Sequence, residues 1–150
     1  MFMIREAEAE DALALMELYL HHLTSPPCGS PGTLEDWEKR LHLLSAQKGY
    51  HILVGAEEGR EPVSSVTLVV IQNLTHGMRP YALIENVVTH REYRGKGYAS
   101  ALLQRAVEIA REAGCYKVML LTGSKQESTL RFYEQNGFAR GIKTGFIRSL

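Results

Sequence analysis

The stretch YALIENVVTHREYRGKGYASALLQRAVEIAREAGCYKVMLL, residues 81–121, decides the fold. It opens with a largely apolar run, residues 81–89, that predicts a strand, and closes with the shorter run 118–121, which predicts a strand covered on both faces. Between these runs, apolar residues recur at steps of three and four, and Gly114 supplies a helix stop. The recurring residues are Ala99, Leu102, Leu103, Ala106, Val107 and Ala110. Because a strand, a helix and a second strand follow one another, the crossover predicts two parallel strands.

Further strands are predicted on either side of this unit. Residues 2–5 predict a short first strand, and two β-rich runs, 50–56 and 63–72, are separated by a polar turn and predict an antiparallel pair. A last strand is predicted at about residues 141–148. Together the elements predict an α+β fold, a mixed sheet flanked by helices. The chain of 150 residues is 45% apolar and has no repeat or linker, which predicts one domain over residues 1–150.

Three further helices are predicted from periodicity and capping. The first follows Asp11, and its inward face is predicted to consist of Leu13, Met16, Leu20 and Leu23. The second opens at a capping box formed by Thr33 and Asp36. The third opens at a similar box formed by Ser124 and Glu127.

The composition argues against several classes of protein. Lys plus Arg and Asp plus Glu each number 17, so no net charge attracts nucleic acid or an anionic membrane. The N-terminus is acidic, unlike a signal peptide, and no apolar run approaches the roughly 20 residues of a membrane span. Cys28 and Cys115 lie far apart and the six histidines are scattered, so neither a disulfide framework nor a metal site is predicted. We therefore expect a soluble, cytoplasmic protein without a bound metal.

A glycine-containing loop, RGKGYAS at residues 94–100, joins the strand to the main helix. At the start of a helix, free backbone N–H groups and the helix dipole favour an anion. Gly95 and Gly97 allow the backbone to approach a ligand closely, and Arg94 and Lys96 add positive charge. The loop lacks the third glycine of a dinucleotide fingerprint and the lysine spacing of a P-loop. It is predicted to bind a phosphate, and a glycine turn with solvated charges is the alternative.

The segment IENVVT, residues 84–89, followed by RGKGYA, residues 94–99, resembles the R/Q-x-x-G-x-G/A motif of GNAT-type N-acetyltransferases. CYKVML at 115–120 and FYEQNGF at 132–138 resemble the next strand and helix of that superfamily, notably in its glucosamine-phosphate N-acetyltransferase branch. The order of elements agrees over nearly the whole chain. The resemblance implies a GNAT-like fold, a mostly antiparallel sheet with a parallel, splayed strand pair and flanking helices.

The resemblance also implies acetyl-CoA as the co-substrate. Its pyrophosphate would be bound by the backbone amides of Arg94, Gly95, Lys96, Gly97, Tyr98, Ala99 and Ser100. Its pantetheine arm would lie along Val87, Val88 and Thr89, and the N–H of Val88 would hold the thioester oxygen. Further cofactor contacts would come from Gln126, where the family often has asparagine, and from Thr129.

Tyr133 occupies the position of the family's group that protonates the departing coenzyme A thiolate. A phenol with an ordinary pKa of about 10 can fill this role. Tyr133 also lies at helical spacing from Leu130, so an aromatic residue of the core is the alternative.

Glu85 is a carboxylate inside an apolar run, where an unpaired buried charge would be strongly unfavourable. Burial would raise its pKa toward the range of a general base. The aminosugar branch has an acid at this position, and such an acid can take a proton from the acceptor ammonium directly or through water. A carboxylate at a strand end that is solvated, or paired with a basic residue, is the alternative.

These residues predict an N-acetyltransferase that moves an acetyl group from acetyl-CoA to the primary amine of a small molecule by direct attack in a ternary complex. An aminosugar phosphate or an amino acid is the expected acceptor, and residues 24–32, His76 and Arg79 are predicted to border its pocket. The resemblance also implies a homodimer. A non-catalytic acyl-CoA-binding sensor and an acetyltransferase acting on a protein amine are the alternatives.

Overall fold

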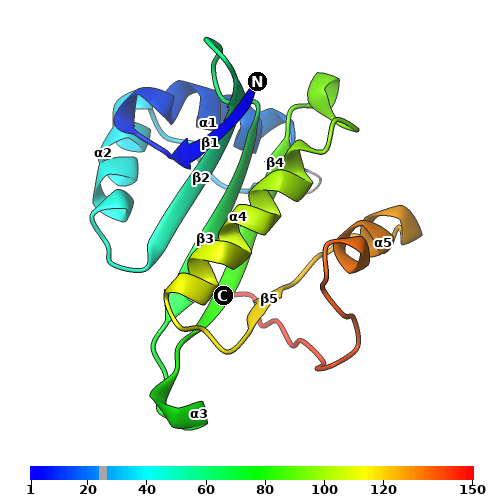
Figure 1. Cartoon of the computed structure of the whole chain (residues 1–150). Coiled ribbons are helices and arrows are strands. Elements are labelled where there is room, and N and C mark those ends of the chain that lie inside the picture. The colour runs from blue at the N-terminus through cyan, green and yellow to red at the C-terminus, as the bar shows by residue number, and fades with distance from the viewer. Residues whose placement is uncertain (24–26) are drawn as a thin grey trace.

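The computed structural model describes residues 1–23 and 27–150. Its centre is one sheet of five strands in the order β1-β2-β3-β4-β5 (Figure 1). The strands are β1 (Phe2–Glu6), β2 (Tyr50–Glu57), β3 (Ser64–Ile71), β4 (Tyr81–Thr89) and β5 (Val118–Leu120). Neighbouring strands pair antiparallel except β4 and β5, which are parallel. The predicted mixed sheet, its antiparallel pair and its parallel crossover are confirmed.

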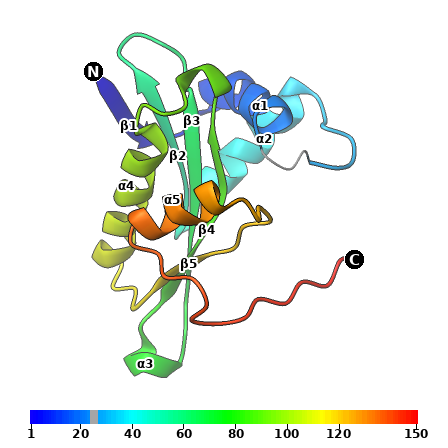
Figure 2. The same cartoon turned by 90° about the vertical axis from the view of Figure 1, so that its right-hand side faces the viewer.

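Helices cover both faces of the sheet (Figure 2). They are α1 (Ala12–His21), α2 (Leu34–Ser45), α3 (Thr75–Met78), α4 (Tyr98–Glu112) and α5 (Glu127–Gln135), with short 3-10 helices η1 (Ala9–Asp11) and η2 (Arg91–Tyr93). Helices α1 and α2 lie on one face and α4 lies on the other. No helix in the described part of the chain combines the length and the apolar character that crossing a membrane requires.

Each face of the sheet carries its own cluster of buried apolar side chains. On the α4 face the cluster contains Leu53, Val66, Leu68, Ala82, Ile84, Leu102, Leu103, Ala106, Ile109 and Ala110. On the other face, Ile52 and Val54 of β2 pack with Leu15 of α1 and Leu41 of α2. Successive residues of β2 thus alternate between the two clusters, as the period of a strand requires. The apolar stripe predicted for α4 is the one that packs on the sheet.

The inward face of α1 differs from the prediction. Ala12, Leu15 and Leu18 are buried, whereas Leu13, which was predicted to face inward, is 59% exposed. Alanine and leucine occupy most positions of this helix, so the spacing of the large residues alone does not select one face. Small side chains at Ala12 and Ala14 let the helix lie close to its neighbours.

The capping box predicted for α2 is confirmed. The Thr33 hydroxyl accepts a hydrogen bond from the Asp36 amide at 3.2 Å, and the Asp36 carboxylate accepts one from the Thr33 amide at 2.8 Å. The indole N–H of Trp37 donates to the carbonyl of Pro31 at 2.6 Å. These bonds fix the segment that leads into α2.

Three expectations for the C-terminal part of the chain are wrong. Residues 141–148 form no strand with the rest of the described chain, and Phe146 among them is 92% exposed. Strand β5 is not covered on both faces, because Met119 at its centre is 40% exposed. Ser124 does not cap α5, because the N-cap residue is Gln126. The backbone N–H of Gln126 donates a hydrogen bond to the Ser124 hydroxyl.

An ion pair between the half-exposed Arg5 and the buried Asp11 joins β1 to the start of α1. Arg5 donates two hydrogen bonds to the carboxylate of Asp11, at 2.6 and 2.8 Å, and the amide of Glu8 donates a third at 2.8 Å. Burial alone would raise the pKa of Asp11, but the hydrogen bonds from Arg5 and Glu8 outweigh it and hold the pKa below its usual value. The carboxylate is therefore ionised at neutral pH and fixes the angle between strand and helix.

Replacing Asp11 by asparagine is expected to lower the free energy of unfolding by about 2 kcal/mol at pH 7, because the charged hydrogen bonds to Arg5 are lost. The folded-state pKa of Asp11 lies below the unfolded value of about 3.9. Its stabilisation is thus fully present above that value and is lost as the pH falls through the folded-state pKa. Urea unfolding at pH 7 and pH 3 measures both effects.

The matched control for this change is Glu10→Gln in the same turn, where the side chain is exposed. It is expected to leave the free energy of unfolding unchanged within about 0.5 kcal/mol. Equal losses for the two variants at pH 7 would show that the Arg5–Asp11 pair does not stabilise the fold.

Candidate functional site

Strands β4 and β5 separate after a short stretch of pairing. Ala82, Leu83 and Ile84 of β4 pair with Val118, Met119 and Leu120 of β5. The rest of β4, from Glu85 to Thr89, pairs only with β3. A wedge therefore opens between the two parallel strands, with backbone groups of β4 along one side.

A β-bulge interrupts β4 inside this wedge. Asn86 has a φ of 52°, and the register with β3 shifts opposite it. The carbonyl of Val88 accepts a hydrogen bond from the Ser64 hydroxyl of β3 at 3.0 Å, so it faces β3. The N–H and C=O of one strand residue point to the same side, so the amide of Val88 also faces β3. If the alternation along the strand continues from Val88 to Val87, the amide of Val87 is expected on the wedge side.

The loop 94–100 lies at the end of β4, and its backbone has the geometry of an anion site. Gly97 is the N-cap of α4 and has a φ of 81°, and Gly95 has a φ of 77°. A Cβ atom at either position would meet no protein atom within 4 Å. The first N–H groups of α4 have no partner within the helix, and the helix dipole places positive potential on them. These donors fit a phosphate group.

The side chain of Arg94 is held by the protein. Its guanidinium donates to the carbonyl of Thr89 at 3.2 Å and to that of His22, at the end of α1, at 2.9 Å. The Thr89 carbonyl therefore faces away from β3, as the alternation along β4 requires. Arg94 contributes positive charge to the loop, while its hydrogen bonds fix the loop to α1.

Glu57 at the end of β2 holds two more side chains of the loop. The Tyr98 hydroxyl donates to its carboxylate at 2.6 Å, and the Lys96 ammonium lies 3.4 Å from the same oxygen. The Tyr98 ring stacks on Phe2 with centroids 3.9 Å apart, and Lys96 lies 4.8 Å from the centroid of Tyr93. The hydrogen bond from Tyr98 lowers the pKa of Glu57. No sequence pattern pointed to Glu57, because it lies in a different element from its partners Lys96 and Tyr98.

Helix α5 is joined to the first turn of α4. The Asn136 side-chain amide donates to the Ser100 hydroxyl at 3.2 Å and to the carbonyl of Phe132 at 2.8 Å. Gln126 and Thr129 lie at the opposite end of α5, where Gln126 is exposed and Thr129 is half-buried. Asn136 therefore contacts the loop through Ser100, whereas the two predicted contact residues lie at the N-terminal end of α5.

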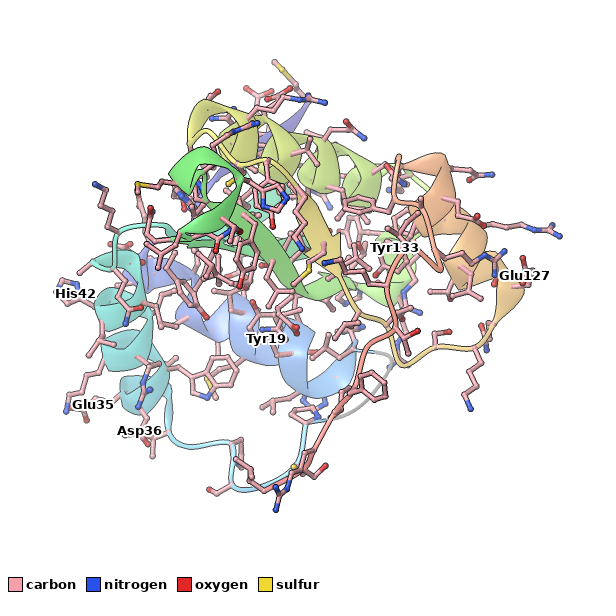
Figure 3. All side chains as sticks on the ribbon, turned by 90° about the horizontal axis from the view of Figure 1, so that it is seen from below. Tyr19, Glu35, Asp36, His42, Glu127 and Tyr133 are labelled. Carbon is pink, nitrogen blue, oxygen red and sulfur yellow. The ribbon has the colours of Figure 1, made fainter. Side chains whose placement is uncertain are left out.

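Tyr133 of α5 is half-buried against the cluster on the α4 face. Figure 3 shows it beside α5. Its ring makes edge-to-face contacts with Phe132 and Phe138, with centroids 5.1 and 6.4 Å away. Burial raises the pKa of the Tyr133 phenol, so it is protonated at neutral pH. The side chain is both a packing residue and a potential proton donor.

Glu85 is exposed, so of the two environments considered for its carboxylate the solvated one is observed. It lies in the part of β4 that has no β5 neighbour. Its partner on β3 is Thr67, which pairs in turn with Ile52 on β2, and Ile52 belongs to the cluster under α1 and α2. Side chains directly opposite one another in a sheet share a face. Glu85 is thus on the α1 side of the sheet and Tyr133 is on the α4 side.

Two residues predicted to border the acceptor pocket lie elsewhere. His76 stacks on Tyr116, with ring centroids 3.9 Å apart, and Arg79 donates to the carbonyls of Gly114 and Cys115, both at 3.1 Å. These contacts lie at the start of β4, roughly 25 Å along the strand from the loop after its end. Arg79 instead fixes the segment between α4 and β5. Of the predicted border 24–32, residues 24–26 lie outside the described residues.

Comparison with known proteins identifies related chains. Residues 14–138 match the acetyltransferase (GNAT) family. A glucosamine 6-phosphate N-acetyltransferase of Trypanosoma brucei brucei is 32% identical over 137 residues, which cover 90% of this chain and 87% of the relative. A solved acetyltransferase structure from Trypanosoma brucei has a TM-score of 0.77 at 30% identity, covering 99% of this chain and 100% of that chain. The glucosamine-6-phosphate N-acetyltransferase from Arabidopsis thaliana shares the fold, with a TM-score of 0.84 at 23% identity over 100% of this chain and 98% of that chain.

The mixed sheet and its flanking helices match a solved acetyltransferase over nearly the whole chain, so the fold is that of an acetyltransferase. This chain belongs to the GNAT family of acetyltransferases. The predicted family, fold and enzyme class are confirmed.

Gly97→Ala is expected to weaken the binding of coenzyme A about tenfold, because a Cβ would enter the space that the loop offers to the phosphates. The residue has a positive φ, so the variant is also expected to lose about 1 kcal/mol of stability. Isothermal titration calorimetry measures the affinity and urea unfolding measures the stability.

Gly114→Ala is the matched control for this change. Gly114 also has a φ of 81° and open space at its Cβ position, but it lies at the other end of α4. The control is expected to lose the same stability and to keep its affinity for coenzyme A. Equal affinity losses in both variants would mean that the loop is not the phosphate site.

Proposed function

We propose that this protein transfers the acetyl group of acetyl-CoA to the primary amine of a small molecule, by direct attack in a ternary complex. The single observation that carries the proposal is the wedge between β4 and β5 with the glycine loop at one end. GNAT acetyltransferases use acetyl-CoA as co-substrate. The proposed acceptor class follows the relatives that act on glucosamine 6-phosphate, an amine of low molecular weight.

In the proposed complex, the backbone of the loop and of β4 holds the co-substrate. The amides of residues 94–100 bind the pyrophosphate, and Val87, Val88 and Thr89 lie along the pantetheine arm. The amide of Val87 takes the role first proposed for Val88, because it lies on the wedge side of β4. A fixed N–H at this point stabilises the negative charge that develops on the thioester oxygen during attack. Gln126 and Thr129 remain proposed contacts from α5.

Proton transfer is proposed to use the two faces of the sheet. Glu85 is exposed on the α1 side, where it takes a proton from the acceptor ammonium through water. Tyr133 is half-buried on the α4 side, where its phenol gives a proton to the departing thiolate. Burial raises the pKa of Tyr133, so the proton to be given is present at neutral pH. The amine thus enters on one face while the thiol leaves on the other.

Tyr133→Phe is expected to lower kcat by about a hundredfold or more, while the affinity for acetyl-CoA stays the same, because only the proton donor is removed. Release of coenzyme A from acetyl-CoA in the presence of a panel of primary amines measures the rate. Tyr116→Phe, at the far end of the sheet, is the control and is expected to keep full activity.

Glu85→Gln in the same assay is expected to move activity to higher pH, where the amine loses its proton without help.

Binding of acetyl-CoA without consumption on any amine, by wild type as well as by the variants, would indicate the acyl-CoA sensor instead. Full activity in Tyr133→Phe would assign Tyr133 to packing alone.

We also propose that the protein forms a homodimer through its C-terminal segment. Residues 139–150 carry exposed apolar side chains, among them Ile142, Phe146 and Ile147, beside the short edge strand β5. Exposed apolar surface next to an unpaired strand edge favours association with a second copy. Sedimentation equilibrium is expected to give a dimer for the full chain and a monomer for a chain that ends at residue 138. A monomeric full chain would refute the proposal.

The proposed location is the cytoplasm. Cys28 and Cys115 are both free thiols, and Cys28 is exposed. An exposed thiol is stable in a reducing compartment. Fractionation of cells that express the tagged full chain tests this location, and recovery outside the cytosolic fraction would refute it.

A further inference from the structure

Hydrogen bonds join the end of α1 to the segment that leads into the glycine loop. The carbonyl of His21 accepts one from the Arg91 guanidinium at 3.1 Å. The carbonyl of His22 accepts one from the Arg94 guanidinium at 2.9 Å. A further bond runs from the backbone N–H of Arg91 to the ring nitrogen Nδ1 of His22, at 3.2 Å. Arg91 begins η2, which ends directly before Arg94, so α1 fixes the point at which the loop begins.

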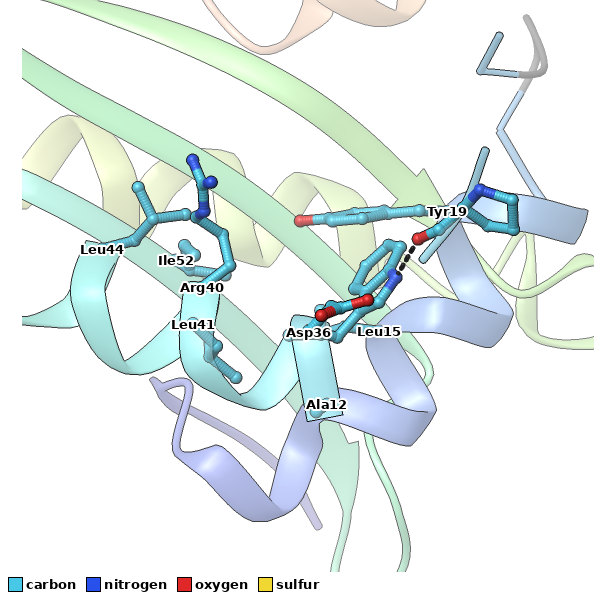
Figure 4. Close-up of a pocket in the computed structure, with 10 residues that line it drawn as sticks. Ala12, Leu15, Tyr19, Asp36, Arg40, Leu41, Leu44 and Ile52 are labelled. Carbon is cyan, nitrogen blue, oxygen red and sulfur yellow. Dashed lines mark hydrogen bonds between the residues drawn. The ribbon is translucent and has the colours of Figure 1, made fainter. Parts of the chain in front are cut away.

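Helix α1 is a firm support for this segment. Ala12 and Leu15 of α1 are buried in one cluster with Leu41 of α2 and Ile52 of β2, and Figure 4 shows these side chains between the two helices and the sheet. At the end of the helix, His22 is itself buried, with 6% of its surface exposed. In a close-packed environment the ring cannot turn away from η2 without displacing its neighbours.

The His22 ring lies among groups of both charges. Its Nε2 is 3.6 Å from a carboxylate oxygen of Glu17 on α1, and its centroid is 4.0 Å from that of the His90 ring, which precedes η2. Arg91 lies on the Nδ1 side, and the Arg94 guanidinium is bonded to the carbonyl. Burial, followed by His90 and Arg91, lowers the pKa of His22, and together they outweigh Glu17, which acts in the opposite direction. The ring is therefore neutral at pH 7.

Of the bonds between α1 and η2, the one to the His22 ring depends on protonation. A neutral imidazole can accept at Nδ1 and donate from Nε2, whereas an imidazolium donates from both nitrogens. Protonation at Nδ1 would therefore set two N–H groups against each other across 3.2 Å, at a buried position. The start of η2 would have to move away from the ring, and Arg94 at its end would move with it.

We propose that neutral His22 is a positioning residue, which holds the glycine loop in the form that binds the pyrophosphate of coenzyme A, and that protonation of His22 weakens this binding. The loop binds through backbone N–H groups with fixed directions, so a shift of its first residues misplaces the donors. The affinity is expected to fall with the pH, whereas attraction between a charged His22 and a phosphate would by itself raise it. This inference rests on the proposed binding of coenzyme A by the loop.

The binding test uses 3′-dephospho-coenzyme A, which keeps the pyrophosphate but lacks the phosphate monoester that titrates near pH 6. Isothermal titration calorimetry measures its affinity for the full chain at pH 7.5 and pH 5.0. Wild type is expected to bind at least about threefold more weakly at pH 5.0, because the pKa of His22 lies below the ordinary histidine value of about 6.5. Tighter binding at pH 5.0 would overturn the role of His22.

Two substitutions of His22 separate its hydrogen bond from its charge. His22→Asn keeps an acceptor, the side-chain carbonyl, and does not titrate, so it is expected to bind within about threefold of wild type at pH 7.5 and equally well at pH 5.0. His22→Leu has no acceptor and leaves the Arg91 N–H unpaired, so it is expected to bind at least about threefold more weakly than wild type at pH 7.5. Retained pH dependence in His22→Asn, or full affinity in His22→Leu, would contradict the assignment.

The matched control is His21→Asn. The exposed ring of His21 lies 3.7 Å from the same Glu17 carboxylate, while its carbonyl, which any residue supplies, is the group bonded to Arg91. The variant is expected to keep the affinity and the pH dependence of wild type. Urea unfolding at both pH values verifies that each variant is folded. Loss of the pH dependence in this control as well would show that His22 is not its source.

NMR titration of the histidine rings identifies the group that responds. Because linkage between two binding events is reciprocal, a ligand that prefers neutral His22 is expected to lower the pKa of His22 when it binds. A packing role alone would not produce this change. A His22 pKa that saturating ligand leaves unchanged, or a shift confined to His90, would overturn the assignment.

The results distinguish this inference from the proposed function. Binding that weakens at low pH in wild type and not in His22→Asn supports the role of His22, and the absence of any acetylation would then overturn the acetyl transfer alone. Acetylation of an amine together with an affinity that does not change with pH would overturn the role of His22 and leave the acetyl transfer intact.

Discussion

Strand β4 has to remain bonded to β3 along its length while it loses its parallel neighbour after Ile84. The bulge at Asn86 lets it do so, because the extra residue increases the local twist and turns the end of β4 away from β5. The antiparallel side supplies the rigidity, and the parallel side supplies the opening. The backbone from Glu85 to Thr89 is left without a β5 partner on that side, which is the condition for receiving an extended ligand.

The loop after β4 illustrates how donors for an anion can be arranged in a chain without net charge. Glu57 lies beside Lys96 and Tyr98 and removes part of the positive potential that the sequence RGKGYAS carries. Arg94 is bonded to main-chain carbonyls. The backbone amides and the helix dipole therefore remain the principal attraction for a phosphate, and they act only at short range and in one orientation. Such a loop would select among anions by the position of their oxygen atoms more than by their net charge.

The sequence predicted those parts of the fold in which one local signal dominates. The apolar stripe of α4, the capping box at Thr33 and the antiparallel pairing of β2 with β3 each arise from neighbouring residues, and each was predicted correctly. The predictions fail, or leave alternatives open, where the outcome depends on distant partners. The exposure of Glu85 depends on where β5 ends, a property of the sheet. The segment 141–148 has strand composition but finds no partner in the described chain. Glu57 contacts Tyr98, which is remote in sequence, and no spacing rule relates the two.

The end of α1 is fixed to the glycine loop. The carbonyl of His22, the residue after α1, accepts a hydrogen bond from Arg94. The His22 ring accepts a further bond from the amide of Arg91, which requires its Nδ1 to be unprotonated. Burial lowers the pKa of His22 and so favours this neutral form. Because both hydrogen bonds end on His22, the position of the loop depends on the position of α1, and the neutral form of this histidine supports both.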